Sequence, residues 1–170
     1  HLHTPKEFYN ISMNTGDILL IIQEFAYLLG VFGFFLVYSI VRGRQAVINL
    51  TVGLYFALLI SLEFPYYSTI LSGGEGDSFM KVLIFGVFTV ISTILMARLM
   101  PRPYQEKKFE SFGKKLLLAI GGTILVMVFS FHVLPVTEFV TPGSPIQAIF
   151  SPKEYFFWWL LAPVVFLYLN

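Results

Sequence analysis

The residues best placed for chemistry are ionisable side chains inside or at the edges of long apolar stretches. Glu24, next to Gln23, lies about two turns into the first such stretch. Glu63 ends the second stretch, and His132 lies near the end of the fourth. A carboxyl group in an apolar medium is costly unless it is protonated or paired, so it marks a candidate functional site. Two carboxylates and an imidazole at similar depth could take up and release a proton or a cation.

The same residues also have a structural interpretation. Glu63 and His132 fall near the ends of their stretches, where water reaches them, and Glu24 can anchor one helix to another by hydrogen bonds. The sequence has no cysteine, no histidine pair at metal-ligand spacing, no nucleotide-binding glycine loop and no nucleophile elbow. We therefore expect no enzymatic activity, no cofactor and no metal site.

Four apolar stretches carry these residues, and each is long enough to cross a lipid bilayer. They run over about 18–41, 46–64, 79–100 and 116–135. A transmembrane helix needs about 20 residues, and backbone groups in lipid must bond within the helix. Only 12% of the residues are charged, whereas soluble domains carry about 25%. The sequence predicts an all-α integral membrane protein with four transmembrane helices, which form a single membrane domain over residues 1–170.

Two shorter segments complete the predicted fold. Ser151, Pro152 and Glu154 together are typical of a helix start, and an aromatic-rich stretch follows them. They predict a short membrane-embedded helix over about 152–169, which is either re-entrant, interfacial or a fifth span. Near the other end, Pro5 to about Met13 predicts a short interfacial helix within an extracytoplasmic segment, 1–16.

The basic residues are distributed unevenly, and this predicts an orientation. The loops after the first and third spans contain eight of the 11 Lys and Arg residues: Arg42, Arg44, Arg98, Arg102, Lys107, Lys108, Lys114 and Lys115. Lys and Arg favour the cytoplasmic side of short loops, so both loops should be cytoplasmic and the N-terminus outside. These side chains either only set this topology or also bind anionic lipid headgroups.

Small residues mark the predicted contacts between helices. Each span contains glycine, which lets two helix backbones approach closely. The predicted packing positions are Gly30, Gly33, Gly53, Gly86, Gly121 and Gly122.

Three segments together resemble the colicin V production protein family of bacterial inner-membrane proteins. The Arg42-Gly43 pair ends one span and runs directly into the next, through Ile40 to Leu50. Phe112 to Leu125 is similar to the family's glycine-punctuated fourth span, and Ser151 to Trp159 to its aromatic C-terminal helix. The chain lacks the family's acidic residue after the Arg-Gly pair and the Asp-Arg before the fourth span. The resemblance covers about residues 17–169 and implies an envelope protein required for toxin production in some bacteria, with no established enzymatic activity.

These observations lead to two expectations for function. The first is a small polytopic protein of the inner (plasma) membrane with an accessory or scaffolding role in the cell envelope. Its partners would be the lipid bilayer and either further copies of itself or a larger membrane complex; no basic surface suggests nucleic acid. The alternative is a proton- or cation-handling subunit of a transporter or channel, which with four spans would act as an oligomer.

Overall fold

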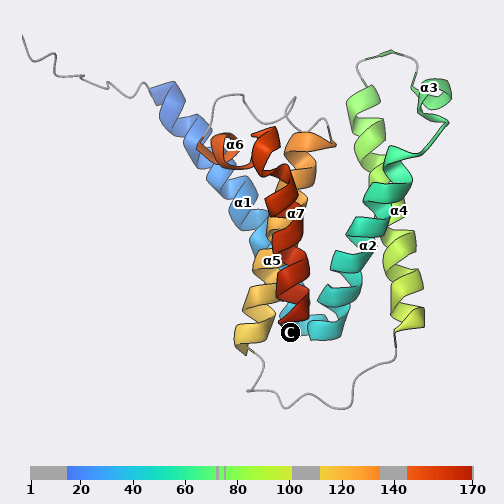
Figure 1. The fold of residues 1–170 in the computed structure, drawn as a ribbon. Helices are drawn as coiled ribbons and strands as arrows, with labels where there is room; N and C mark the ends of the chain where they lie inside the picture. Colours follow the sequence, from blue (N-terminus) through green and yellow to red (C-terminus); the bar gives the residue numbers. More distant parts are fainter. Residues whose placement is uncertain (1–14, 72, 75, 101–111, 135–144, 170) are drawn as a thin grey trace, which may run out of the picture.

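The chain folds into a bundle of helices in the computed structural model, which describes residues 15–169 except 72, 75, 101–111 and 135–144 (Figure 1). All of the regular secondary structure in these ranges is helical. The helices are α1 (Thr15–Arg42), α2 (Arg44–Leu62), α3 (Tyr67–Ile70), α4 (Asp77–Leu99), α5 (Phe112–His132), α6 (Pro145–Phe150) and α7 (Lys153–Tyr168).

Four of these helices are long and apolar enough to cross a membrane, as the sequence predicted. They are α1 from Ile21, α2, α4 and α5. Hydroxyl groups inside them bond to the helix itself: the Thr51, Thr93 and Thr123 hydroxyls each donate to the carbonyl oxygen four residues earlier, at 2.7–2.8 Å. The hydroxyls of these three threonines are therefore satisfied within their own helices.

α5 lies at the centre of the bundle. It packs extensively against α1 and α7 and also contacts α2, and Leu118, Leu125 and Val128 on it are fully or almost fully buried. α4 packs mainly against α2, and none of its extensive contacts is with α1. The bundle therefore has a compact side around α5 and a second side formed by α2 and α4 (Figure 1).

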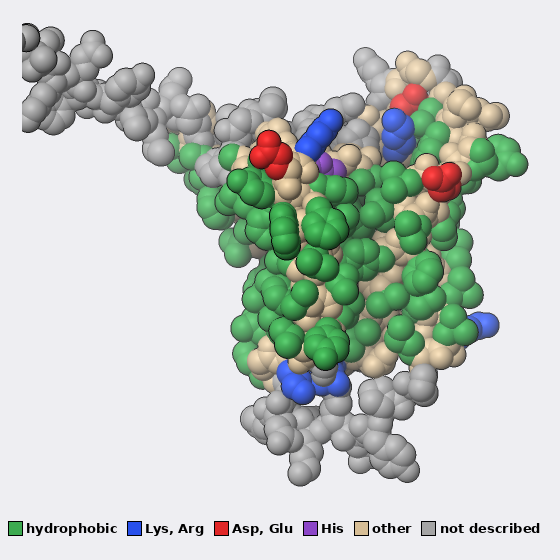
Figure 2. Space-filling model, viewed as in Figure 1, with side chains coloured by type: hydrophobic (Ala, Val, Ile, Leu, Met, Phe, Trp, Pro, Cys, Tyr) green, Lys and Arg blue, Asp and Glu red, His purple; other side chains and the backbone are tan. Residues whose placement is uncertain are grey.

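The two ends of the helix bundle differ in the charges that they carry. Basic side chains gather at the end that holds the α1–α2 turn and the start of α5, whereas acidic and basic side chains mix at the other end, on either side of an apolar band (Figure 2). Gly43 alone joins α1 to α2, with φ 86° and ψ 169°, a conformation that only glycine adopts readily.

The predicted C-terminal helix exists, but its predicted fifth crossing is not confirmed. α7 has 16 residues and is not among the four candidate spans. It runs beside α5 and ends near the α1–α2 turn (Figure 1). It begins at Lys153, with Pro152 rather than Ser151 as the preceding cap residue and no side-chain cap.

Other parts of the fold lie outside the prediction. The interfacial helix expected near the N-terminus falls outside the described residues. The short helices α3 and α6 follow α2 and precede α7, in segments for which the sequence predicted no helix.

Candidate functional site

The polar cluster expected from the sequence is not joined by contacts among the residues that the structure describes. His132 Nε2 donates to the carbonyl oxygen of Phe150 at 2.7 Å, so the imidazole ties the end of α5 to α6. Glu63 is exposed and directly follows the last residue of α2, and Gln23 is exposed on α1. No hydrogen bond or ion pair links these three described side chains, and the side chain of Glu24 is not described. No group of His, Asp and Glu in the described ranges could hold a metal ion.

The six predicted packing glycines divide into two sets. A Cβ added at Gly53 would meet Thr93 of α4, one at Gly121 would meet Phe166 of α7, and one at Gly122 would meet Phe35 of α1. These glycines lie at the α2–α4, α5–α7 and α1–α5 contacts. A Cβ at Gly30, Gly33 or Gly86 would meet no atom of a described residue within 4 Å. These three glycines therefore lie on open surface in the described part of the chain, and not at a contact between its helices.

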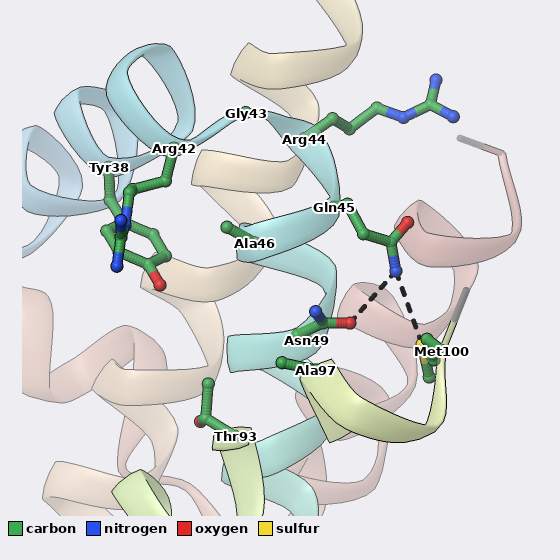
Figure 3. Close-up of a pocket in the computed structure, with 10 residues that line it drawn as sticks. All are labelled: Tyr38, Arg42, Gly43, Arg44, Gln45, Ala46, Asn49, Thr93, Ala97 and Met100. Atoms are coloured by element: carbon green, nitrogen blue, oxygen red, sulfur yellow. Dashed lines mark hydrogen bonds between the residues drawn. The ribbon is translucent and has the colours of Figure 1, made fainter. Parts of the chain in front are cut away.

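A polar cavity lies at the basic end of the bundle, and we call it the basic-end pocket. Its volume is about 580 Å³, within the range of about 300–1,000 Å³ typical of ligand sites. Residues of α1, α2 and α4, with Gly43 and Met100 next to them, line it: Tyr38, Arg42, Gly43, Arg44, Gln45, Ala46, Asn49, Thr93, Ala97 and Met100 (Figure 3). The cavity thus depends on how these three helices come together.

Hydrogen bonds orient the amide side chains of this pocket. Gln45 Nε2 donates to Asn49 Oδ1 at 3.0 Å and also reaches Met100 Sδ at 3.6 Å. Asn49 is only 7% exposed, and no described residue accepts a hydrogen bond from its Nδ2. In Figure 3 this nitrogen lies on the side of the pocket that faces Tyr38 and Arg42, whereas the Arg44 guanidinium points away from Asn49. The pocket therefore presents one buried amide donor to its interior.

An apolar groove continues from the basic-end pocket along α1. Its lower part, about 440 Å³, shares Tyr38 and Arg42 with that pocket and is otherwise lined by Gly30, Gly33, Phe34, Val37 and Val41. Its upper part, about 670 Å³, shares Gly30 and Phe34 with the lower part. There α1 faces Leu50 and Leu54 of α2 and Thr89 and Val90 of α4. We call the basic-end pocket and the apolar groove together the lateral cleft.

Hydroxyl groups near the groove are already bonded within the protein. Thr89 Oγ1 donates to the carbonyl oxygen of Phe85 at 2.9 Å. The hydroxyls of Tyr27 and Ser130 bond to each other at 2.8 Å. The walls of the groove therefore offer hydrocarbon rather than hydrogen-bonding groups, and the cleft is polar at one end and apolar along the rest.

Sequence reasoning missed several lining residues of this cleft. It selected Arg42, Arg44, Gly30 and Gly33, but not Tyr38, Gln45, Asn49 or Thr93. The spacing of Gln45 and Asn49 four residues apart on one helix was the available signal. Their meeting with α1 and α4 is set by tertiary packing.

Comparisons with known proteins found no relative: no protein-family model, no curated protein and no solved structure matches the chain.

Proposed function

We propose that the chain is a small multi-pass membrane protein with an accessory or scaffolding role in the cell envelope, as in the colicin V production protein family that it resembles. In this role it holds another membrane component in the lateral cleft. The observation that carries the proposal is the groove itself, whose wall includes Gly30 and Gly33, where an added Cβ would meet no atom within 4 Å. Glycines that pack on no other described part of their chain suit contact with a neighbour in the bilayer.

The proposed location is the inner or plasma membrane, with the basic end cytoplasmic and the N-terminus outside. The four candidate spans support a multi-pass arrangement, and the gathering of Lys and Arg at one end supports this orientation (Figure 2). The lateral cleft would then open toward the cytoplasmic leaflet at Arg42 and toward the bilayer core at Gly30.

The alternative, a proton- or cation-handling subunit, stays a prediction from the sequence. Among described residues, no contact joins Gln23, Glu63 and His132, and His132 already bonds a backbone carbonyl. We also propose that the role is not catalytic. Assembly into a homo-oligomer or a larger membrane complex is one way in which the cleft would be filled.

The proposal is tested by narrowing the groove. The protein is purified from its membrane, and native mass spectrometry identifies what remains bound, whether lipid or protein. Gly30→Phe and Gly33→Phe should remove the bound species, because their rings would occupy the groove. Leu29→Phe is the matched control, since Leu29 lies on the same helix, is 62% exposed and does not line the groove. A wild-type chain that carries nothing, or groove variants that keep the same species, would contradict the proposal.

A further inference from the structure

The charges around the basic-end pocket select the kind of molecule that it can bind. Among the described residues that line it are Arg42 and Arg44, and none of them is acidic. Arg42 forms no ion pair with any residue that the structure describes. A guanidinium binds phosphate or carboxylate oxygens through two parallel N–H bonds. The pocket is therefore suited to an anion.

A neutral hydrogen-bond donor and the start of α2 also favour an anion in the pocket. The side chain of Asn49 is only 7% exposed, and its Nδ2 faces the cavity with no hydrogen-bond acceptor among described residues. Gln45 holds Asn49 Oδ1, which keeps the acceptor of that amide engaged and its donor turned inward (Figure 3). α2 begins at this pocket with no side-chain cap, so its positive dipole end adds to the attraction for an anion.

The apolar groove shows what must be attached to this anion. The groove begins at Tyr38 and Arg42 themselves, so a molecule whose anionic group lies at Arg42 can continue directly along α1. Groove volumes of about 440 and 670 Å³ suit a hydrocarbon chain. A hydrocarbon chain is also narrower than a second helix, which is about 10–12 Å across with its side chains.

We propose that the lateral cleft binds one anionic phospholipid from the cytoplasmic leaflet. Its phosphate pairs with Arg42 and accepts a hydrogen bond from Asn49 Nδ2, and one acyl chain lies in the groove along α1. This inference rests on the proposed function, since it names the component that the cleft holds. The lipid would fill the space between α1 and α4, two helices without an extensive direct contact.

The test compares lipids that differ only in headgroup charge. The protein in detergent is titrated with phosphatidylglycerol or phosphatidylcholine of the same acyl chains, and native mass spectrometry counts bound lipids. The wild type should bind one phosphatidylglycerol more tightly than further copies, and more tightly than phosphatidylcholine. Arg42→Gln should weaken this site about tenfold or more, the effect of losing a charged hydrogen bond. Asn49→Leu should weaken it by a smaller factor.

Matched variants separate a specific site from general basic charge. Arg98→Gln removes an exposed arginine in the last turn of α4, which does not line the pocket, and should leave the affinity unchanged. Arg42→Lys keeps the charge and should retain part of the affinity. If Arg42→Gln folds poorly, Arg42→Lys takes its place in the comparison with the wild type. Gly33→Phe should weaken long-chain phosphatidylglycerol more than its dihexanoyl analogue, because only the long chain needs the groove.

Several results would overturn the lipid assignment. These are equal binding of the two lipids, equal losses in Arg42→Gln and Arg98→Gln, or displacement of phosphatidylglycerol by excess inorganic phosphate, which would indicate a site for a free anion. A bound protein that is lost on Gly33→Phe would also overturn it while leaving the proposed function standing. A cleft that holds no species at all would overturn both.

Discussion

Gly53 of α2 lies directly against the backbone of Thr93 on α4. A Cβ added at Gly53 would come within 2.9 Å of the Thr93 backbone nitrogen and 3.0 Å of its Cα. Backbone atoms cannot turn aside as a flexible side chain can. The α2–α4 contact is the main attachment of α4 to the bundle, and it therefore depends on the absence of a side chain at Gly53.

Gly53→Ala should destabilise the protein by about 1–3 kcal/mol, the usual effect of forcing an extra methyl group into a packed contact. Gly86→Ala on α4 is the control, since a Cβ there would meet nothing within 4 Å, and it should stay within about 0.5 kcal/mol of the wild type. Unfolding in mixed micelles measures both changes. Equal stability of the two variants would contradict the close α2–α4 packing.

The contact between Gly122 and Phe35 predicts strong coupling between these positions. Gly122→Ala places a methyl group against the ring of Phe35, which is 2% exposed and has little room to move. Phe35→Leu should relieve part of that clash, so a double-mutant cycle should give a coupling energy of about 0.5–3 kcal/mol. Free energies of unfolding for the four proteins measure it. Additive effects would show that the α1–α5 contact lies elsewhere.

Tyr55→Phe tests the bond between α2 and α7. The Tyr55 hydroxyl donates to the carbonyl oxygen of Leu160 at 2.5 Å, in the helical turn that precedes Pro163. Hydrogen bonds between membrane helices contribute about 0.6 kcal/mol on average and up to about 1.7, so a loss in this range is expected. Tyr66→Phe is the control, because Tyr66 is 60% exposed and has no such bond among described residues. Indistinguishable thermal unfolding of the two variants would refute the contribution.

The proposed orientation is testable with two glycine-to-cysteine variants, since the sequence has no cysteine. Gly74 lies just before α4 and Gly113 lies in the first turn of α5, at opposite ends of the bundle, and both are exposed. A maleimide that does not cross membranes should label Gly74→Cys in intact cells and Gly113→Cys only after permeabilisation. The reverse pattern would place the basic end outside.

The course of α7 gives a further prediction. α7 ends near the α1–α2 turn (Figure 1), so we expect its C-terminal end on the same side of the membrane as Gly113. At about 1.5 Å per residue, its 16 residues extend about 24 Å, somewhat less than the hydrocarbon core. Leu169→Cys should therefore be protected from the same maleimide in intact cells. Labelling without permeabilisation would make α7 re-entrant.

The long helices could be predicted from sequence because their signal is local. Apolar composition and length alone identify a span, and the predicted 46–64 and 79–100 differ by two residues or fewer from α2 and α4 at each end. α3 and α6 have four and six residues, too few for any periodic pattern to appear. The same limit applies to α7, whose length does not distinguish a crossing from a partial insertion.

The candidate site was less accessible to sequence reasoning. Glycine identifies a place where helices can approach but not whether one does, so Gly53 and Gly30 looked alike although only Gly53 packs on another helix. Asn49 and Thr93 are polar residues within predicted spans, yet they line one cavity only because α4 folds back onto α2. Which residues meet in one cavity depends on which helices pack together, and no single segment of the amino-acid sequence determines that.

Gly43 also limits how far the first two helices can separate. With one residue between Arg42 and Arg44, the ends of α1 and α2 that meet at Gly43 stay within about 7 Å of each other along the chain. α1 and α2 can therefore part only at their far ends, by pivoting about Gly43, whereas α4 and α5 are joined by a longer segment, residues 100–111.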